Sequence, residues 1–129
     1  MIVDSSALVA ILLGEAESLS FARALQAAPV KLIAAPTYLE TCMVMVRRSG
    51  VEARQDVDDL MRRSEIQIVH FTPQAASLAV SAFLNFGKGR HPANLNFGDC
   101  LSYALTKTEA MPLLYKGDDF PLTDVESAL

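Results

Sequence analysis

The chain opens with MIVDSSALVA, residues 1–10, in which an apolar β-branched pair runs directly into an acid and two hydroxyl residues. Ile2 and Val3 favour a short buried strand, and the Asp-Ser-Ser that follows is typical of a helix start. The apolar residues Ala7–Leu13 then continue as a helix. The carboxylate of Asp4 therefore either caps this helix or stands where a strand delivers it to a functional site.

The rest of the chain repeats this alternation of short strands and helices. Apolar periodicity and turn residues predict the order helix 17–27, strand 31–34, helix 36–48, helix 51–63, strand 66–70, helix 73–86, helix 99–109 and strand 112–115. Strands separated by helices pair in parallel through right-handed crossovers. We therefore expect an α/β fold, a three-layer α/β/α sandwich around a central parallel sheet of about four to five short strands.

Composition limits the classes of protein to be considered. The length of 129 residues suits one domain, so we expect residues 1–129 to fold as a single unit. A net charge of -4 disfavours nonspecific coating of nucleic acid, and any contact with nucleic acid must be local. No apolar run reaches the ~20 residues that span a bilayer, so we expect a soluble, cytoplasmic protein without membrane contact. Cys42 and Cys100 are expected to be buried, reduced thiols.

Four segments of the chain place acids where the predicted topology would bring them together. Asp4 follows the first strand, Glu40 lies on the helix after the second, Asp99 opens the helix before the last strand, and Asp118 and Asp119 follow that strand. The carboxyl ends of parallel strands lie at one edge of a sheet, and their loops converge there. The sequence therefore predicts an acidic cluster at that edge.

Local structure offers an alternative explanation for each acid. Asp4 and Asp99 could cap helices, and Thr37–Glu40 fits a capping box in which the glutamate reaches back to the cap residue. Asp118 and Asp119 follow a glycine in a turn, where aspartate is common. Local patterns leave these alternatives open.

Electrostatics give the cluster a chemical meaning. Two carboxylates ~5 Å apart repel by roughly 3 kcal/mol at an effective dielectric of ~20. A bare cluster would destabilise the fold or force protonation, whereas a hard divalent cation such as Mg²⁺ removes the repulsion and takes oxygen ligands. Such an ion activates water and polarises a phosphoryl oxygen, as hydrolysis of a phosphodiester requires.

Four blocks of the sequence together resemble the VapC toxins of the PIN-domain ribonucleases. They are MIVDSSALVAILLGE (1–15), PTYLETCMVMVRR (36–48), HPANLNFGDCLSYAL (91–105) and LLYKGDDFPLTDV (113–125), and they span nearly the whole chain. The resemblance implies a PIN-like fold and an endoribonuclease that depends on Mg²⁺ or Mn²⁺ and cleaves single-stranded segments of structured RNAs, such as tRNA loops. It also implies a VapB-type antitoxin as partner, and the apolar surplus in composition fits a homodimer as well as an antitoxin groove.

The same resemblance assigns roles to individual residues. Asp4, Glu40, Asp99 and Asp119 are implied as metal-binding and catalytic acids, Asp4 and Asp99 most directly. Related sequences keep an acid directly before the phenylalanine, which places the fourth role on Asp119 rather than on Asp118. Ser6 is implied as a hydroxyl that supports the first acid, although a helix-start hydroxyl is the alternative. Whether one or two ions act is open.

A long glycine-rich loop, residues 87–98, precedes Asp99 and is of the kind usually kept for function. Its cationic residues, Lys88, Arg90 and His91, are candidates for binding RNA phosphates, and a solvated charged loop is the alternative. His91 is also a candidate proton donor.

Two other functions compete with the nuclease. A phosphotransferase or phosphatase with a strand-end aspartate as nucleophile normally has a second aspartate two residues on, where this chain has Ser6. The non-enzymatic alternative is a catalytically silent PIN-like module that binds protein, whose expected mark is the loss of an acid. No such loss is seen, and neither a dinucleotide fingerprint nor a P-loop occurs.

Overall fold

The computed structural model describes all residues, 1–129, and contains four strands and six α-helices. In chain order they are β1 (Ile2–Val3), α1 (Ser5–Leu12), α2 (Ser18–Ala27), β2 (Leu32–Ala34), α3 (Ala35–Ser49), α4 (Ala53–Arg63), β3 (Gln67–Val69), α5 (Pro73–Phe86), α6 (Phe97–Glu109) and β4 (Leu113–Leu114), followed by a short 3-10 turn, η1 (Phe120–Leu122).

The strands form one parallel sheet in the order β3-β2-β1-β4, and the predicted parallel pairing is confirmed. Ile2 pairs with Leu32 on one side and with Leu113 on the other, so β1 is a central strand although it has only two residues. The loops that follow β1, β2 and β4 consequently leave the sheet at the same edge.

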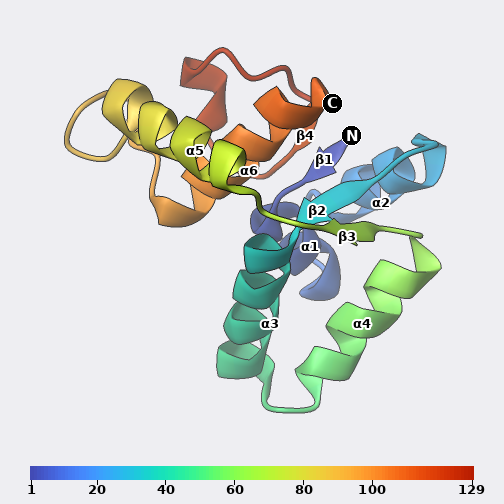
Figure 1. The fold of residues 1–129 in the computed structure, drawn as a ribbon. Coiled ribbons are helices and arrows are strands. Elements are labelled where there is room, and N and C mark those ends of the chain that lie inside the picture. Colours follow the sequence, from blue (N-terminus) through green and yellow to red (C-terminus); the bar gives the residue numbers. More distant parts are fainter.

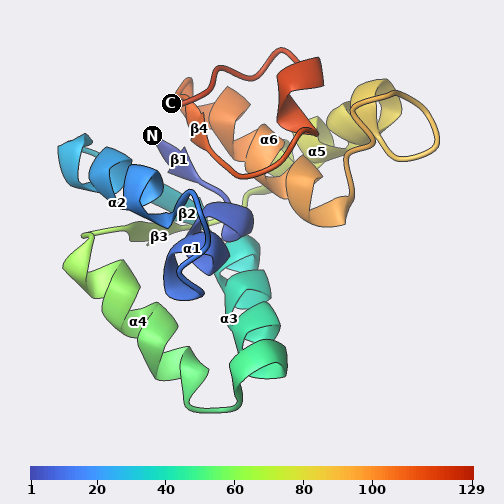
Figure 2. The ribbon, with the colours of Figure 1, turned by 180° about the vertical axis from the view of Figure 1, so that it is seen from behind.

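Alternation along the strands divides the core into two parts. Ile2, Leu32 and Leu113 point to the side covered by α5 and α6, and their immediate neighbours in the chain point to the opposite side, which α1 to α4 cover. Figures 1 and 2 show the resulting three layers, with α5 and α6 on one side of the sheet and the hairpin of α3 and α4 on the other. The predicted three-layer sandwich is confirmed.

Helix boundaries lie within two residues of the predicted ones. Helix α5 has the predicted bounds, because Thr72 caps it through its side chain and Pro73 begins it. Helix α3 begins at Ala35, one residue early, and α6 begins at Phe97, two residues early, because Asn96 acts as its cap. The second shift matters for Asp99, which lies inside the first turn and not at the cap.

Two apolar stripes that are spaced like buried helix faces point outward. On α3, Leu39 and Met43 are 57% and 46% exposed, while the buried residues of that helix include Thr37 and Thr41. On α5, Val80 is 59% exposed, and Phe83 and Leu84 are also exposed. Within a single chain, nothing covers these stripes.

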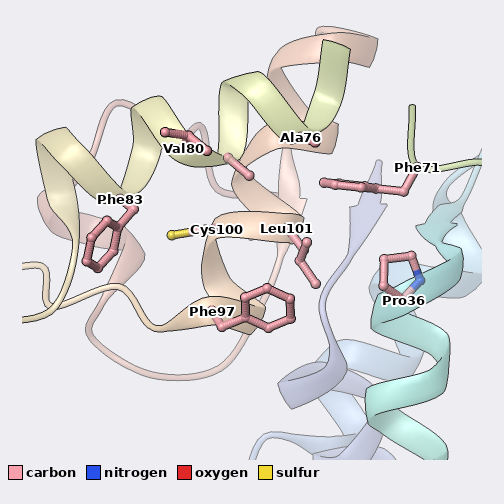
Figure 3. Close-up of a pocket in the computed structure, with 9 residues that line it drawn as sticks. Pro36, Phe71, Ala76, Val80, Phe83, Phe97, Cys100 and Leu101 are labelled. Carbon is pink, nitrogen blue, oxygen red and sulfur yellow. The ribbon is translucent and has the colours of Figure 1, made fainter. Parts of the chain in front are cut away.

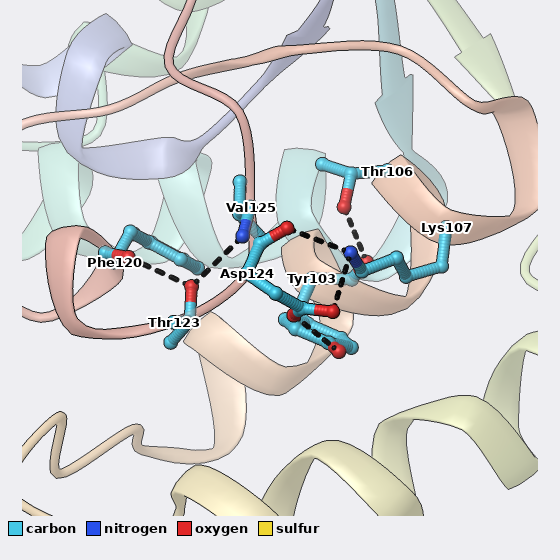
Figure 4. Close-up of polar contacts among 7 residues, drawn as sticks. All are labelled: Tyr103, Thr106, Lys107, Phe120, Thr123, Asp124 and Val125. Carbon is cyan, nitrogen blue, oxygen red and sulfur yellow. Dashed lines mark hydrogen bonds and ion pairs between the residues drawn. The ribbon is translucent and has the colours of Figure 1, made fainter.

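The C-terminal segment is held against α6 by a small polar cluster, drawn in Figure 4. The Tyr103 hydroxyl donates to Asp124 Oδ1 at 2.8 Å, and Lys107 Nζ lies 3.0 Å from Asp124 Oδ2 and donates to the Asp124 carbonyl oxygen at 2.9 Å. Lys107 also lies over the Tyr103 ring. These contacts keep the turn that carries Asp119 close to α6.

Cys42 and Cys100 are buried free thiols, as predicted from their apolar helical surroundings. None of the helices has both the length and the apolar character that a membrane span needs.

Candidate active site

Asp4 is fixed at the carboxyl end of β1 by hydrogen bonds to both oxygens of its carboxylate. Oδ2 accepts from the Ser6 amide at 2.9 Å and from the Ser6 hydroxyl at 2.6 Å, and Oδ1 accepts from the Ser102 hydroxyl at 2.5 Å. The side chain caps α1, so the helix-capping explanation is correct. Asp4 is only 3% exposed. A carboxylate held this firmly caps a helix and still presents a fixed direction to a ligand, so the two explanations of Asp4 are compatible.

The Ser6 hydroxyl is itself oriented by the residue that follows β4. It accepts a hydrogen bond from the Lys116 amide at 2.9 Å while it donates to Asp4. The Lys116 ammonium lies 2.6 Å from Glu15 Oε2 and 3.0 Å from Glu17 Oε2, and these two contacts raise its pKa. The loop after α1 and the loop after β4 are thereby joined directly behind Asp4.

Asp99 lies in the first turn of α6 within a capping box. Its Oδ2 accepts from the Asn96 amide at 2.8 Å, and Asn96 Oδ1 accepts from the Asp99 amide at 3.0 Å. The spacing Asn-x-x-Asp in NFGD is the sequence signal for this arrangement. Asp99 therefore takes part in helix capping, but as the third residue of the helix, and its Oδ1 remains for another partner.

Glu40 lies in the middle of α3, and the capping box that its spacing suggested is absent. The helix begins at Ala35 with Pro36 in its first turn, so Thr37 is already inside the helix and cannot cap it. The Glu40 carboxylate instead reaches across to the start of α6. A Cβ added at Gly98 would lie 2.5 Å from Glu40 Oε1 and 2.7 Å from Oε2. Only glycine leaves room for this carboxylate beside Asp99.

The pKa shifts show that the acids act on one another. Burial raises the pKa of Asp99 from 3.8 to about 7, and the charges of Asp4, Asp119 and Glu40 raise it as well, against the lowering effect of the Asn96 amide. Burial also raises the pKa of Glu40, and the charge of Asp4 adds to this. The structure thus brings all four sequence-predicted acids into one electrostatic cluster. Of the two acids that follow β4, Asp119 and not Asp118 has a charge that raises the pKa of Asp99.

A hard divalent cation fits the chemistry of this cluster. Glu40 Oε2 is buried and has no hydrogen-bond partner, which costs free energy unless another group neutralises it. As they stand, no three His, Cys, Asp or Glu side chains are arranged to hold one ion between them. Mg²⁺ is commonly bound by one or two carboxylates and several waters, so a complete protein cage is not required. Asp4 and Asp99 would hold the ion, with Glu40 and Asp119 beside them.

The cationic residues of the glycine-rich loop, Lys88, Arg90 and His91, form no salt bridge with these acids, and the stretch that carries them is called the cationic loop below. It closes through a bridge between Gly87 and Leu95 and projects beyond the end of α5 (Figures 1 and 2). The Arg90 guanidinium lies 5.3 Å from the Phe83 ring centre, and His91 Nδ1 accepts from the Ala93 amide at 3.1 Å. His91 is therefore occupied within its own loop, while Lys88 is exposed.

Two features near the site escaped the sequence analysis. Ser102 is a buried hydroxyl that contacts Asp4, and a serine inside a helix carries no sequence signal for such a contact. The other is an apolar groove of about 550 Å³ formed by side chains from α5, the first turn of α6 and the start of α3, drawn in Figure 3. Phe97, two residues before Asp99, lines it and is 80% exposed.

Comparison with known proteins finds relatives over nearly the whole chain. The family model for the PIN domain matches residues 1–126. Ribonuclease VapC30 of Mycobacterium tuberculosis is 40% identical over 125 residues, which cover 97% of this chain and 95% of the relative. Ribonuclease VapC of Mycolicibacterium smegmatis is 42% identical over 125 residues, 97% of each chain. Ribonuclease VapC28 of Mycobacterium tuberculosis is 43% identical over 130 residues, which cover 100% of this chain and 98% of the relative.

A solved structure has the same fold. The crystal structure of Mycobacterium tuberculosis VapC20, described as a toxin that cleaves the sarcin-ricin loop, superposes with a TM-score of 0.78 over 96% of this chain and 95% of that one. The two sequences are 19% identical, so this likeness concerns the fold alone.

Proposed function

The chain belongs to the PIN-domain family and, within it, to the VapC ribonucleases, and from this premise we propose how its acidic cluster acts on RNA. The protein is a ribonuclease toxin of a VapBC pair. We propose that residues 1–129 form one catalytic domain, which cleaves RNA internally with Mg²⁺ or Mn²⁺ bound at the carboxyl end of β1.

One observation carries this proposal. Asp4, Glu40, Asp99 and Asp119 come from four separate segments, Asp4 is joined to α6 by the Ser102 hydroxyl, and the Glu40 carboxylate lies against Gly98, next to Asp99 in the chain. The charges of Asp4, Asp119 and Glu40 raise the pKa of the half-buried Asp99 carboxyl. Like charges placed around such an acid disfavour its charged form unless a cation compensates them. We assign Asp4 and Asp99 as the principal metal ligands, Glu40 as the third acid and Asp119 as the fourth, with Ser6 holding Asp4.

The chemistry divides between the ion and the chain. When bound, a divalent cation lowers the pKa of water and stabilises the charge that develops on the phosphoryl oxygens. Asp4 keeps one direction because hydroxyls hold both of its oxygens. Asp99 Oδ2 is held by the Asn96 amide, so Oδ1 is the oxygen that remains for the ion or for a water proton. Glu40 supplies Oε2, which no protein group satisfies.

The RNA would reach this edge of the sheet as a single-stranded segment, such as a tRNA loop. The cationic loop extends from α5 on the same side of the sheet as α6, and we propose that Lys88 and Arg90 contact phosphates at a distance from the cleavage point, with His91 shaping the loop. The net charge of -4 makes such local contacts necessary.

The partners follow from the family and from the uncovered surfaces. We propose a VapB-type antitoxin as the inhibitor and the cytoplasm as the place of action. We also propose a homodimer through the groove between α5 and α6, because Val80 and Phe83 of α5 line the groove and are exposed, and Leu84 on the same helix is exposed outside it. A face with both features can pack against a copy of itself about a twofold axis.

Cleavage of RNA by purified protein tests the proposed function. Wild type, Asp4→Asn and Asp99→Asn would be incubated with a structured RNA, with Mn²⁺ and with a chelator. We expect metal-dependent internal cuts by the wild type and a loss of at least about 100-fold in both variants, because each change removes a charged ligand. If both variants cleaved RNA as fast as the wild type, the assignment would be refuted. A wild type that never cuts RNA would favour a silent protein-binding module.

A further inference from the structure

The hydroxyl of Ser102 makes an unusual contact for a serine inside a helix. Its side chain is 1% exposed, and its Oγ donates to Asp4 Oδ1 at 2.5 Å, from a position 98 residues further along the chain. This hydrogen bond joins α6 to the end of β1 in the middle of the molecule.

Four other helix hydroxyls in this protein bond within their own helix. Those of Thr41, Ser81, Thr106 and Thr108 each donate to a backbone carbonyl three or four residues earlier in their own helix. Such back-bonding is the usual behaviour of serine and threonine inside helices. Ser102 forgoes it in favour of a carboxylate on another element, which indicates a role beyond satisfying a buried hydroxyl.

The position of Ser102 ties two acids together. It lies three residues after Asp99, so both side chains project from the same side of α6, one turn apart. Asp99 is locked to the helix start by the Asn96 amide, and Asp4 is locked to α6 by Ser102. On its other oxygen, Asp4 is held by Ser6. Hydrogen bonds to both oxygens therefore restrain the Asp4 carboxylate, and the bond from Ser102 is the one that ties it to α6, the helix that carries Asp99.

We propose that Ser102 is a positioning residue that fixes the Asp4 carboxylate for divalent-metal binding. The proposal rests on the proposed function, since it gives Asp4 the role of metal ligand. Ser102 does not contact the ion or the RNA. It acts through Asp4, and its loss leaves the carboxylate free to turn about the Ser6 hydrogen bonds.

Metal affinity distinguishes this role from a purely structural one. Removing a group that orients a metal ligand typically weakens metal binding by about 10- to 100-fold. Mn²⁺ binding would be measured by calorimetry and electron paramagnetic resonance on wild type, Ser102→Ala and Asp4→Asn. Thr106→Val is the matched control, because it removes a buried hydroxyl from the same helix, one turn further on, without touching an acid.

We expect Ser102→Ala to raise the Kd for Mn²⁺ by about tenfold or more, and Thr106→Val to leave it within about threefold of wild type. The Mn²⁺ concentration at half-maximal RNA cleavage should rise by the same factor in Ser102→Ala, with much of the rate recovered at saturating Mn²⁺. If Ser102→Ala does not fold, Ser102→Cys, a weak donor of similar size, takes its place with the same expectation.

The outcomes separate the two claims. A Ser102 variant that binds Mn²⁺ as tightly as wild type, while Asp4→Asn binding is lost, would overturn the positioning role and leave the proposed function standing. Unchanged RNA cleavage by Asp4→Asn would instead overturn the proposed function.

Discussion

Individual residues in this protein serve two purposes at once. Asp4 caps α1 and belongs to the acidic cluster, and Asp99 completes a capping box while its half-buried carboxyl feels the charges of the other acids. The capping prediction was right for Asp4, whereas the cap of α6 is Asn96 and Asp99 is the third residue of that helix.

For Glu40 the capping prediction was wrong. A capping box at Thr37–Glu40 needs the helix to begin after Thr37, whereas α3 begins at Ala35 with Pro36 in its first turn. The place of Glu40 in the cluster was predicted from its position on the helix after the second strand, and the family resemblance added its proposed role.

Ser102 shows what the sequence could not supply. Nothing in its neighbourhood distinguishes it from a serine that bonds its own helix, and its partner is 98 residues away. Gly98 is a similar case, since a glycine in a helix start reads as a turn residue until the Glu40 carboxylate is seen beside it. Contacts between distant segments of the chain are invisible to local patterns.

At the residue scale, the raised pKa of Asp99 predicts how the metal-free protein responds to pH. Because the folded state binds the proton more tightly than the unfolded state, the stability this gives is fully present below the ordinary pKa of 3.8 and lost as pH rises through about 7. The pKa of Glu40 is raised as well, so Glu40 contributes to stability with the same dependence on pH. We expect the metal-free Tm of the wild type to fall between about pH 5 and about pH 8 more steeply than that of Asp99→Asn.

Differential scanning calorimetry across this range, with a chelator present, measures the effect. Added Mn²⁺ should raise the wild-type Tm most at the upper end, where the carboxylates are charged and bind the ion best. Parallel curves for wild type and Asp99→Asn would mean that Asp99 titrates normally in the folded protein.

Gly98→Ala gives a second prediction at this scale. Alanine favours a helix by up to about 1 kcal/mol over glycine, and the Glu40 carboxylate is the flexible end of a side chain that can move aside. We expect an unchanged or higher Tm, together with a Mn²⁺-induced rise in Tm that is clearly smaller and RNA cleavage reduced by about tenfold or more. Thr108→Ala, on an exposed turn of α6, is the control and should cleave normally. Full activity in Gly98→Ala would show that the position of Glu40 is unimportant.

At the scale of elements, the positions of the helices in the sequence were predicted well, but which side of each helix is buried was not. Helical periodicity located α5 to the residue, but the apolar stripe through Val80, Phe83 and Leu84 is exposed, and the buried positions of α5 are Ala75 and Ala82. A stripe has the same spacing whether it packs on its own sheet or on another chain. Periodicity therefore shows that a face is apolar, and only the three-dimensional structure shows which partner is left to cover it.

The proposed homodimer is tested on this face of α5. Val80 lines the groove between α5 and α6, so Val80→Glu places a charge in the groove, and burying that charge in a dimer would be strongly unfavourable. In sedimentation velocity at micromolar concentration, we expect wild type to be dimeric, Val80→Glu to be monomeric with little change in Tm, and Gln74→Glu, a charge elsewhere on the same helix, to remain dimeric. A monomeric wild type, or a dimer that tolerates Val80→Glu, would exclude this interface.

At the scale of the whole molecule, the site lies where the two halves of the core meet. Glu40 belongs to α3 on one side of the sheet, Asp99 belongs to α6 on the other, and Asp4 leaves the sheet between them. The predicted parallel topology was enough to place three strand ends at one edge. It did not show that glutamate from one layer crosses to a glycine in the other, which depends on how closely the two layers pack.

The central claim is that these carboxylates trap a divalent cation, and anomalous X-ray scattering from crystals soaked in Mn²⁺ tests it most directly. We predict an anomalous peak within bonding distance of Asp4 and Asp99, about 2.0 to 2.4 Å from carboxylate oxygens, and no such peak in crystals of Asp99→Asn. A peak located away from these two residues, or none there at saturating Mn²⁺, would contradict it.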